Sequence, residues 1–253
     1  MSGRNRGKHK VPTNGSRQFS AWEDKKVDIV KGCPNRCKYC NIRSGAKRFH
    51  WIRDFGQWGR AYHQLRENDV RKRRKTNYGT VRFPTKHDIT PKFLGECVTA
   101  VKQLLGAGNH VIVCSKPRLE CIKRFCEEFA DYRSDIEYRF TITAMDDAIL
   151  RHWEPGAPDF EERLACLRLA CEKGFRTSVN IEPMLDSPNV VKLFHRLAPY
   201  VNVFINVGKM KDVKRNVQPR TRREEAAVRR IEENQTDDKI REIHEALKDE
   251  PLV

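Results

Sequence analysis

Residues 27–41 read VDIVKGCPNRCKYCN, a short apolar run followed at once by three cysteines. The run Val27–Val30 is rich in β-branched residues and predicts a strand. Cys33, Cys37 and Cys40 then form a C-x3-C-x2-C array in one tight loop. Three thiolates so placed can hold three irons of a [4Fe–4S] cluster and leave the fourth iron without a protein ligand. An open iron distinguishes a catalytic cluster from one that only carries electrons.

Zinc is the main alternative for this loop. Structural zinc usually takes four ligands, often as two separated pairs. The chain has no second C-x2-C pair, although His50 could supply a fourth ligand. The remaining cysteines on predicted helices are spaced so that their thiols do not share a helix face, and core packing explains them better than a second cluster does: Cys97, Cys121, Cys126, Cys166 and Cys171.

The composition is that of a globular protein with a very polar surface. The chain has 253 residues, a net charge of +16 and nine cysteines. An odd number of cysteines without a secretory signal favours metal ligation over disulfides. The opening MSGRNRGKHK has no apolar core, and no run approaches the roughly 20 apolar residues that cross a bilayer. We therefore expect a cytoplasmic protein that does not enter a membrane.

The positive charge favours a polyanionic partner, because basic side chains gain affinity by displacing counterions from nucleic acid. A merely soluble cationic surface and an acidic membrane face are the alternatives. Residues 41–79 add aromatic rings to this charge, and rings that stack on bases beside cations that meet phosphates suit nucleotides. The same rings could instead seal the cluster loop: Trp51, Phe55, Trp58 and Tyr62.

Strand-like runs alternate with helical patterns over most of the chain. This order predicts an α/β fold with a parallel sheet and right-handed crossovers, either a partial barrel or an open doubly wound sheet. The expected helices follow Thr90-Pro91, follow Pro158-Asp159, and cover Asn189–Leu197. The expected strands are Val27–Val30, Thr80–Phe83, His110–Cys114, Ile136–Thr143, Thr177–Ile181 and Val201–Val207.

The segment YRFTITAMDDAILRHWEPGAPDFEERLACLRLACEKGF resembles spore photoproduct lyase and its relatives in the radical S-adenosylmethionine (SAM) superfamily. The likeness lies in a strand at Arg139–Ile142, a turn at His152–Gly156 and a helix at Phe160–Ala165. VCSKP around Lys116 resembles a further strand element of that group, and the likeness extends over roughly residues 27–185. The resemblance implies a partial (β/α)6 barrel with its cofactors at the carboxyl ends of the strands.

The resemblance also implies the chemistry and the residues that support it. Cys33, Cys37 and Cys40 would hold a [4Fe–4S] cluster whose open iron binds SAM, and one electron from a donor such as flavodoxin or ferredoxin would yield a 5′-deoxyadenosyl radical. Tyr39 stands where these enzymes usually have an aromatic residue. Lys116 would contact the methionyl carboxylate of SAM, and either Thr141 or Thr143 would present a hydroxyl to the same group.

Three residues are candidates for contact with the substrate. Spore photoproduct lyases carry a hydrogen-donating cysteine after the second strand, but this chain has Thr85 there, and an O–H bond is too strong to replace a thiol. Cys114 could take over as donor or could be an ordinary buried cysteine. Glu182 stands at the end of the fifth predicted strand, where a carboxylate can bind ribose or substrate hydroxyls or simply face solvent.

We therefore predict three regions. Residues 1–20 form a disordered basic tail, residues 21–215 the partial barrel with the basic aromatic insertion 41–79, and residues 216–253 a charged C-terminal helix. The predicted function is a radical SAM enzyme that abstracts hydrogen from a nucleic-acid, nucleoside or nucleobase-derived substrate in a modification, lyase or repair reaction. The alternatives are a radical SAM enzyme for a peptide or small metabolite, and a non-enzymatic zinc-containing nucleic-acid-binding protein.

Overall fold

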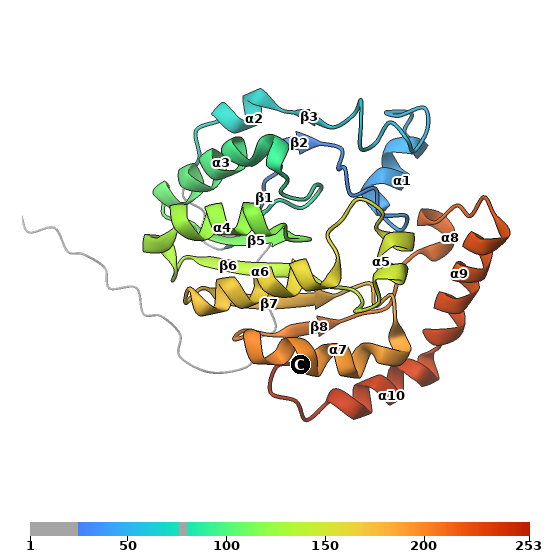
Figure 1. Ribbon diagram of the computed structural model, residues 1–253. Helices are drawn as coiled ribbons and strands as arrows, with labels where there is room; N and C mark the ends of the chain where they lie inside the picture. The colour runs from blue at the N-terminus through green and yellow to red at the C-terminus, as the bar shows by residue number, and fades with distance from the viewer. Residues whose placement is uncertain (1–24, 76–79) are drawn as a thin grey trace, which may run out of the picture.

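Parallel strands lie side by side in one curved sheet in the computed structural model, which describes residues 25–75 and 80–253 (Figure 1). The predicted tail, residues 1–20, lies outside the described residues. All pairs in this sheet are parallel, which requires a crossover between each strand and the next. The strands, in their order across the sheet, are β1 (Lys25–Lys26), β4 (Thr80–Phe83), β5 (His110–Ser115), β6 (Ile136–Thr141), β7 (Arg176–Ile181) and β8 (Ile205–Val207).

Helices cover one face of the sheet and make the crossovers (Figure 1). The Asp159 side chain caps the helix after residue 159, accepting from the Glu162 N–H at 2.8 Å. Gly174, with φ +79°, lets the chain leave that helix. Between the strands lie α1 (Asn41–Arg48), α2 (Glu67–Arg71), α3 (Leu94–Gly106), α4 (Leu119–Glu128), α5 (Asp147–Trp153), α6 (Phe160–Glu172) and α7 (Val190–Leu197), with short 3-10 turns η1 (Pro91–Phe93), η2 (Ala130–Tyr132), η3 (Ser187–Asn189) and η4 (Ala198–Tyr200). Three further helices follow the last strand and make no crossover: α8 (Val213–Asn216), α9 (Arg222–Asn234) and α10 (Asp237–Leu247).

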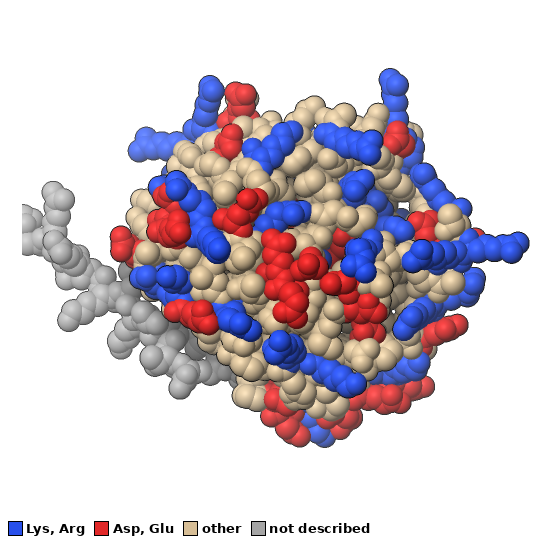
Figure 2. Space-filling model, viewed as in Figure 1, with Lys and Arg blue, Asp and Glu red and all other residues tan. Residues whose placement is uncertain are grey.

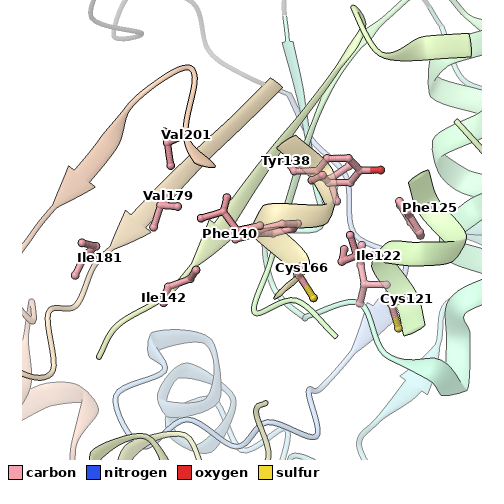
Figure 3. Packing of buried hydrophobic residues seen from close by; sticks show 14 of the residues in the cluster. Cys121, Ile122, Phe125, Tyr138, Phe140, Ile142, Cys166, Val179, Ile181 and Val201 are labelled. Carbon is pink, nitrogen blue, oxygen red and sulfur yellow. The ribbon is translucent and has the colours of Figure 1, made fainter. Parts of the chain in front are cut away.

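The main core lies between the sheet and these helices. Alternate residues of β6, Tyr138 and Phe140, point to the helices and pack with residues of α4 and α6 (Figure 3). Core packing is confirmed for Cys97, Cys121, Cys126 and Cys166, whose thiols are buried, whereas Cys171 is half-buried. Burial raises the pKa of the Cys121 thiol to about 12 and that of Cys126 to about 11, so both stay protonated and inert.

The first and last predicted strands are displaced. Only Lys25 and Lys26 pair with β4, and the Val27 N–H still donates to the Arg82 carbonyl at 3.0 Å before the chain turns away. Val30 then pairs in a separate antiparallel ribbon, β2 (Val30–Lys31) with β3 (Gln64–Leu65). The last strand begins at Ile205 rather than Val201, because the Asn202 side chain takes the place of a ladder partner and accepts from the Thr177 N–H at 2.9 Å.

The predicted single helix of residues 216–253 is two helices, α9 and α10. The break is at Gln235, a buried residue whose side chain accepts from the Met210 N–H and donates to the Met184 carbonyl, both at 2.6 Å. These bonds tie the C-terminal segment to the loops after β7 and β8, and a continuous helix could not make them. No helix among the described residues combines the length and the apolar character that a membrane span requires.

Candidate functional site

A loop from Gly32 to Cys40 joins β2 to α1 and carries the three cysteines. The thiols of Cys33 and Cys37 are buried, that of Cys40 is half-buried, and none is in a disulfide. Gly32 has φ +74°, and a Cβ at this position would lie 2.4 Å from the Trp58 carbonyl oxygen. The loop therefore needs glycine here in order to pack tightly on the segment around Trp58.

Helix α1 holds this loop through its first turn. The Cys40 sulfur caps the helix and accepts from the Arg43 N–H at 3.4 Å. The buried Arg43 guanidinium donates to two carbonyl oxygens of the loop, those of Arg36 at 3.1 Å and Lys38 at 2.9 Å. Sequence reasoning missed Arg43, which lies in a basic stretch where a solvated arginine is the ordinary expectation.

The turn after α5 supports the loop from the other side. The Trp153 carbonyl accepts from the Lys38 N–H at 2.8 Å, and the Asn35 carbonyl accepts from the Gly156 N–H at 3.1 Å. A Cβ on Gly156 would lie 2.2 Å from the Pro34 carbonyl oxygen, so no side chain is tolerated there. This turn is the His152–Gly156 motif, and its glycine is required by the close approach of the two backbones.

Asp88 connects the cysteine loop to the end of β5. Its carboxylate accepts from the Asn35 amide at 2.7 Å, the Lys116 N–H at 2.7 Å, the Ser115 hydroxyl at 3.2 Å and the Cys33 thiol at 3.5 Å. Burial alone would raise the pKa of this carboxyl, but the Lys116 ammonium and these hydrogen bonds bring the pKa below its usual value. Asp88 is therefore a half-buried carboxylate that positions the loop.

Lys116 stands among acidic groups at the end of β5. Its ammonium lies 5.7 Å from the centre of the Tyr39 ring and interacts electrostatically with Cys37, Asp88 and Glu154. Burial lowers the pKa of Lys116, but these neighbours together raise the pKa well above its usual value. The side chain is only half-buried, so the protein does not enclose this cation completely.

Glu154 and Arg163 form a fully buried ion pair behind Tyr39, with 2.5 Å between the Arg163 Nη2 and Glu154 Oε2 atoms. The other carboxylate oxygen of Glu154 accepts from the Tyr39 and Thr143 hydroxyls, the latter at 3.1 Å. Burial raises the pKa of Glu154, but Arg163 and Lys116 bring it below its usual value. The Thr143 hydroxyl is thus engaged inside the protein. Neither Glu154 nor Arg163 was assigned a role from the sequence, although both lie in the quoted motifs.

Thr141 lies on the face of the sheet opposite to the helices. Residues of β6 alternate between the two faces, and Thr141 is in register with Asn180 of β7, which is in register with Asn206 of β8. These three side chains are half-buried and form a polar row across neighbouring strands. Cys114 is also half-buried on this face, in register with Arg139.

Thr85 and Glu182 are each held by neighbours. The Thr85 hydroxyl donates to the Asp28 carboxylate at 2.8 Å, and the same carboxylate accepts the Thr85 and Lys86 N–H groups at 2.6 and 2.7 Å. Glu182 accepts from the Asn206 amide at 3.1 Å and pairs with the Lys211 ammonium at 2.7 Å. Lys116 therefore lies beside Tyr39 of the cysteine loop, while Thr85 and Glu182 belong to other loops.

The cysteine loop fits an iron–sulfur cluster better than it fits one metal ion. Cys33 and Cys37 interact electrostatically, as do Cys37 and Cys40, so the thiols are near one another. No three His, Cys, Asp or Glu side chains in residues 25–75 and 80–253 converge as ligands of a single ion. A cluster does not need such convergence, because each thiolate binds a different iron. His50, proposed as a fourth zinc ligand, is exposed beyond the far end of α1.

The family model described as the radical SAM superfamily matches residues 27–189, which is more than half of the chain. The chain belongs to the radical SAM superfamily. Radical SAM enzymes use a [4Fe–4S] cluster and SAM, and the cofactor prediction is confirmed at that level. A search of curated proteins finds no match to the chain.

Solved structures support the same fold for this radical SAM enzyme. A cysteine-to-serine mutant of spore photoproduct lyase has a TM-score of 0.54 at 12% identity, with 93% of this chain and 76% of that chain covered. A cysteine-to-alanine mutant with dinucleoside spore photoproduct has a TM-score of 0.53 at 13% identity, with 88% and 71% covered. A tyrosine-to-phenylalanine mutant has a TM-score of 0.51 at 15% identity, with 84% and 61% covered. The predicted partial barrel is confirmed, in preference to an open doubly wound sheet.

Proposed function

We propose that Cys33, Cys37 and Cys40 each bind one iron of the [4Fe–4S] cluster and that Lys116 binds the carboxylate of SAM beside it. The observation that carries this proposal is the half-buried Lys116 side chain beside a loop of three free thiols: its backbone N–H donates to Asp88 and its ammonium lies 5.7 Å from the Tyr39 ring centre. When bound, the cluster and SAM supply a 5′-deoxyadenosyl radical that abstracts hydrogen.

The residues of this chain would orient SAM in the following way. A point cation suits a carboxylate, and the charged neighbours of Lys116 keep it protonated. Thr141 is the better of the two predicted threonines for a ligand, because the Thr143 hydroxyl already donates to Glu154. The Tyr39 ring would pack beside the cofactor, with its hydroxyl fixed by Glu154.

Substrate contacts are proposed for the sheet face that carries Thr141 and for the loops at its edge. Cys114 would face the substrate from β5, and Glu182 would bind hydroxyl groups of a ribose. Because the hydroxyl of Thr85 donates to Asp28, we propose that Thr85 positions its loop and does not exchange hydrogen with the substrate.

We infer a nucleic-acid, nucleoside or nucleobase-derived substrate from the net charge of +16 and the basic aromatic insertion. The solved structure with dinucleoside spore photoproduct concerns another protein of this fold, and its ligand is a precedent for this substrate class. We also propose a cytoplasmic location and an acidic electron donor such as flavodoxin or ferredoxin. The reaction would be of a modification, lyase or repair type.

Binding titrations test the substrate class. The reconstituted protein is expected to bind single-stranded DNA, duplex DNA or tRNA, and the affinity should fall by about tenfold or more between low and physiological salt, because bound phosphates release counterions. Fluorescence anisotropy at two salt concentrations measures this. Lack of salt-sensitive binding to all three nucleic acids would contradict the proposal and would favour a peptide or small metabolite.

A further inference from the structure

The loop after α1 presents two aromatic side chains to solvent. Phe49 and Trp51 are each 60% exposed, while Trp58, in the same insertion, is 2% exposed. Their rings lie 5.8 Å apart with an interplanar angle of 32°. Large exposed aromatic pairs are costly to keep in water, so their presence together points to a partner.

The backbone of this loop fixes the pair in an outward position. His50, between the two rings, has φ +58°, and the Phe49 and Trp51 N–H groups donate to the carbonyls of Gly45 at 2.8 Å and Ala46 at 2.9 Å. The next residue, Ile52, is 2% exposed and packs under the loop with Ala46, Trp58 and Cys33. The rings are therefore presented by a preorganised loop, which reduces the entropy lost on binding.

The surroundings of the pair are basic. The Arg48 guanidinium lies 5.2 Å from the Phe49 ring centre, and residues 41–53 include further basic side chains and no Asp or Glu. The next acidic residue, Asp54, accepts from the N–H groups of Gly56 and Gln57 at 2.7 and 3.2 Å. Figure 2 shows Lys and Arg side chains projecting at the upper right, where Figure 1 places α1 and its loop.

We propose that Phe49 and Trp51 form a stacking platform for unpaired bases of a single-stranded nucleic acid, with the exposed Arg48 placed to meet its phosphates. This inference rests on the proposed nucleic-acid substrate and names its form. Every base has a π face, so two rings beside cations bind single strands without a sequence code. A duplex hides those faces in its stack and should bind here more weakly.

The position of the platform relates it to the reaction site. Helix α1 starts at the Cys40 cap and ends one residue before Phe49, so one helix of eight residues, roughly 12 Å long, connects the cysteine loop to the platform. A strand held on the platform could extend from there towards the cysteine loop. The platform thus selects substrates with exposed bases and takes no part in the chemistry of SAM.

Anisotropy titration of the reconstituted protein with a fluorescein-labelled poly-dT strand tests the platform. The variant Phe49→Ala/Trp51→Ala is expected to bind about 10- to 100-fold more weakly. Trp51→Phe, which keeps a ring, should bind nearly as wild type does. Tyr132→Ala removes a 38% exposed ring in η2, at the opposite ends of the strands, and serves as the matched control with unchanged affinity.

The possible results of this titration distinguish failure of the platform proposal from failure of the proposed nucleic-acid substrate. Wild-type-like affinity of the double alanine variant would overturn the platform and leave the nucleic-acid substrate standing. Failure of the wild-type protein to bind poly-dT, duplex DNA or tRNA would overturn both. Trp51-dependent binding to anionic vesicles in place of poly-dT would assign the aromatic pair to a membrane surface and contradict the inference. SAM cleavage without nucleic acid should be equal in all variants.

Discussion

The variant Lys116→Met is expected to bind SAM about 10- to 100-fold more weakly, because a hydrogen bond between two charged groups contributes roughly 1.5–3 kcal/mol. Lys116 supplies the cation at a site whose other charged groups, Cys37, Asp88 and Glu154, repel a carboxylate when they are ionised. The loss should therefore be at the upper part of this range. Equilibrium dialysis of SAM with the anaerobically reconstituted protein measures it.

Two controls distinguish the loss of the Lys116 contact to SAM from the loss of the whole cluster site: the iron content of the variant and a matched surface variant. Lys123→Met removes an exposed lysine from α4 and should leave SAM affinity unchanged. Lys116→Arg keeps the charge but not the compact shape, and should recover only part of the affinity. Unchanged SAM affinity in a Lys116→Met protein with a full complement of iron would show that Lys116 does not bind the cofactor.

The variant Arg163→Met is expected to lower the free energy of unfolding by about 3–5 kcal/mol, because it leaves the buried Glu154 carboxylate without its cation. Arg163 also donates to the carbonyls of Pro158 at 2.9 Å and Thr141 at 3.4 Å, so the change removes further support behind the site. Urea denaturation of the apoprotein measures the difference.

A pair on the surface provides the control for this prediction. Arg124→Met breaks the ion pair with Glu128 on α4, where Arg124 is largely exposed, and should cost less than about 1 kcal/mol. The double variant Glu154→Met/Arg163→Met should recover stability relative to Arg163→Met, because no charge is then buried without a partner. A cost for Arg163→Met no larger than that for Arg124→Met would contradict this account.

The inner strands could be predicted from sequence because their side chains alternate and their ends carry turn signals. β6 and β7 follow from Ile136–Thr143 and Thr177–Ile181 to within two residues. Val27–Val30 has equally good β composition, yet β1 precedes it and Val30 belongs to another ribbon. A β-branched composition indicates that side chains are buried, not that they belong to one strand. Val27 and Val30 are both buried, but they lie in different parts of the chain's path.

The break between α9 and α10 shows a second limit. The sequence of residues 221–248 is charged and favours helix on both sides of the break, and helix propensity does not single out Gln235 as the place to stop. The stop depends on two hydrogen bonds from Gln235 to backbone groups of residues 184 and 210, which are distant in the chain. Hydrogen-bond partners that are so distant in the chain depend on how the elements pack, which local sequence does not show.

The same reasoning explains which site residues could be predicted. The cysteines and Lys116 stand in short local patterns, so spacing and resemblance identify them as candidates. Asp88 stands in no such pattern, because its role depends on Cys33, Asn35, Ser115 and Lys116, which two separate segments supply. The Glu154–Arg163 pair likewise acts through Tyr39. These residues position other groups, and only their contacts show what they do.

Anaerobic reconstitution with iron and sulfide, followed by dithionite and SAM, tests the central claim most directly. The wild-type protein and a Cys171→Ala control are expected to hold about four irons per chain and to release 5′-deoxyadenosine. The variant Cys33→Ala/Cys37→Ala/Cys40→Ala should hold no cluster and release none. Equal 5′-deoxyadenosine from that variant, or one zinc without sulfide in the anaerobically purified wild-type protein, would contradict the assignment of the cluster to this loop.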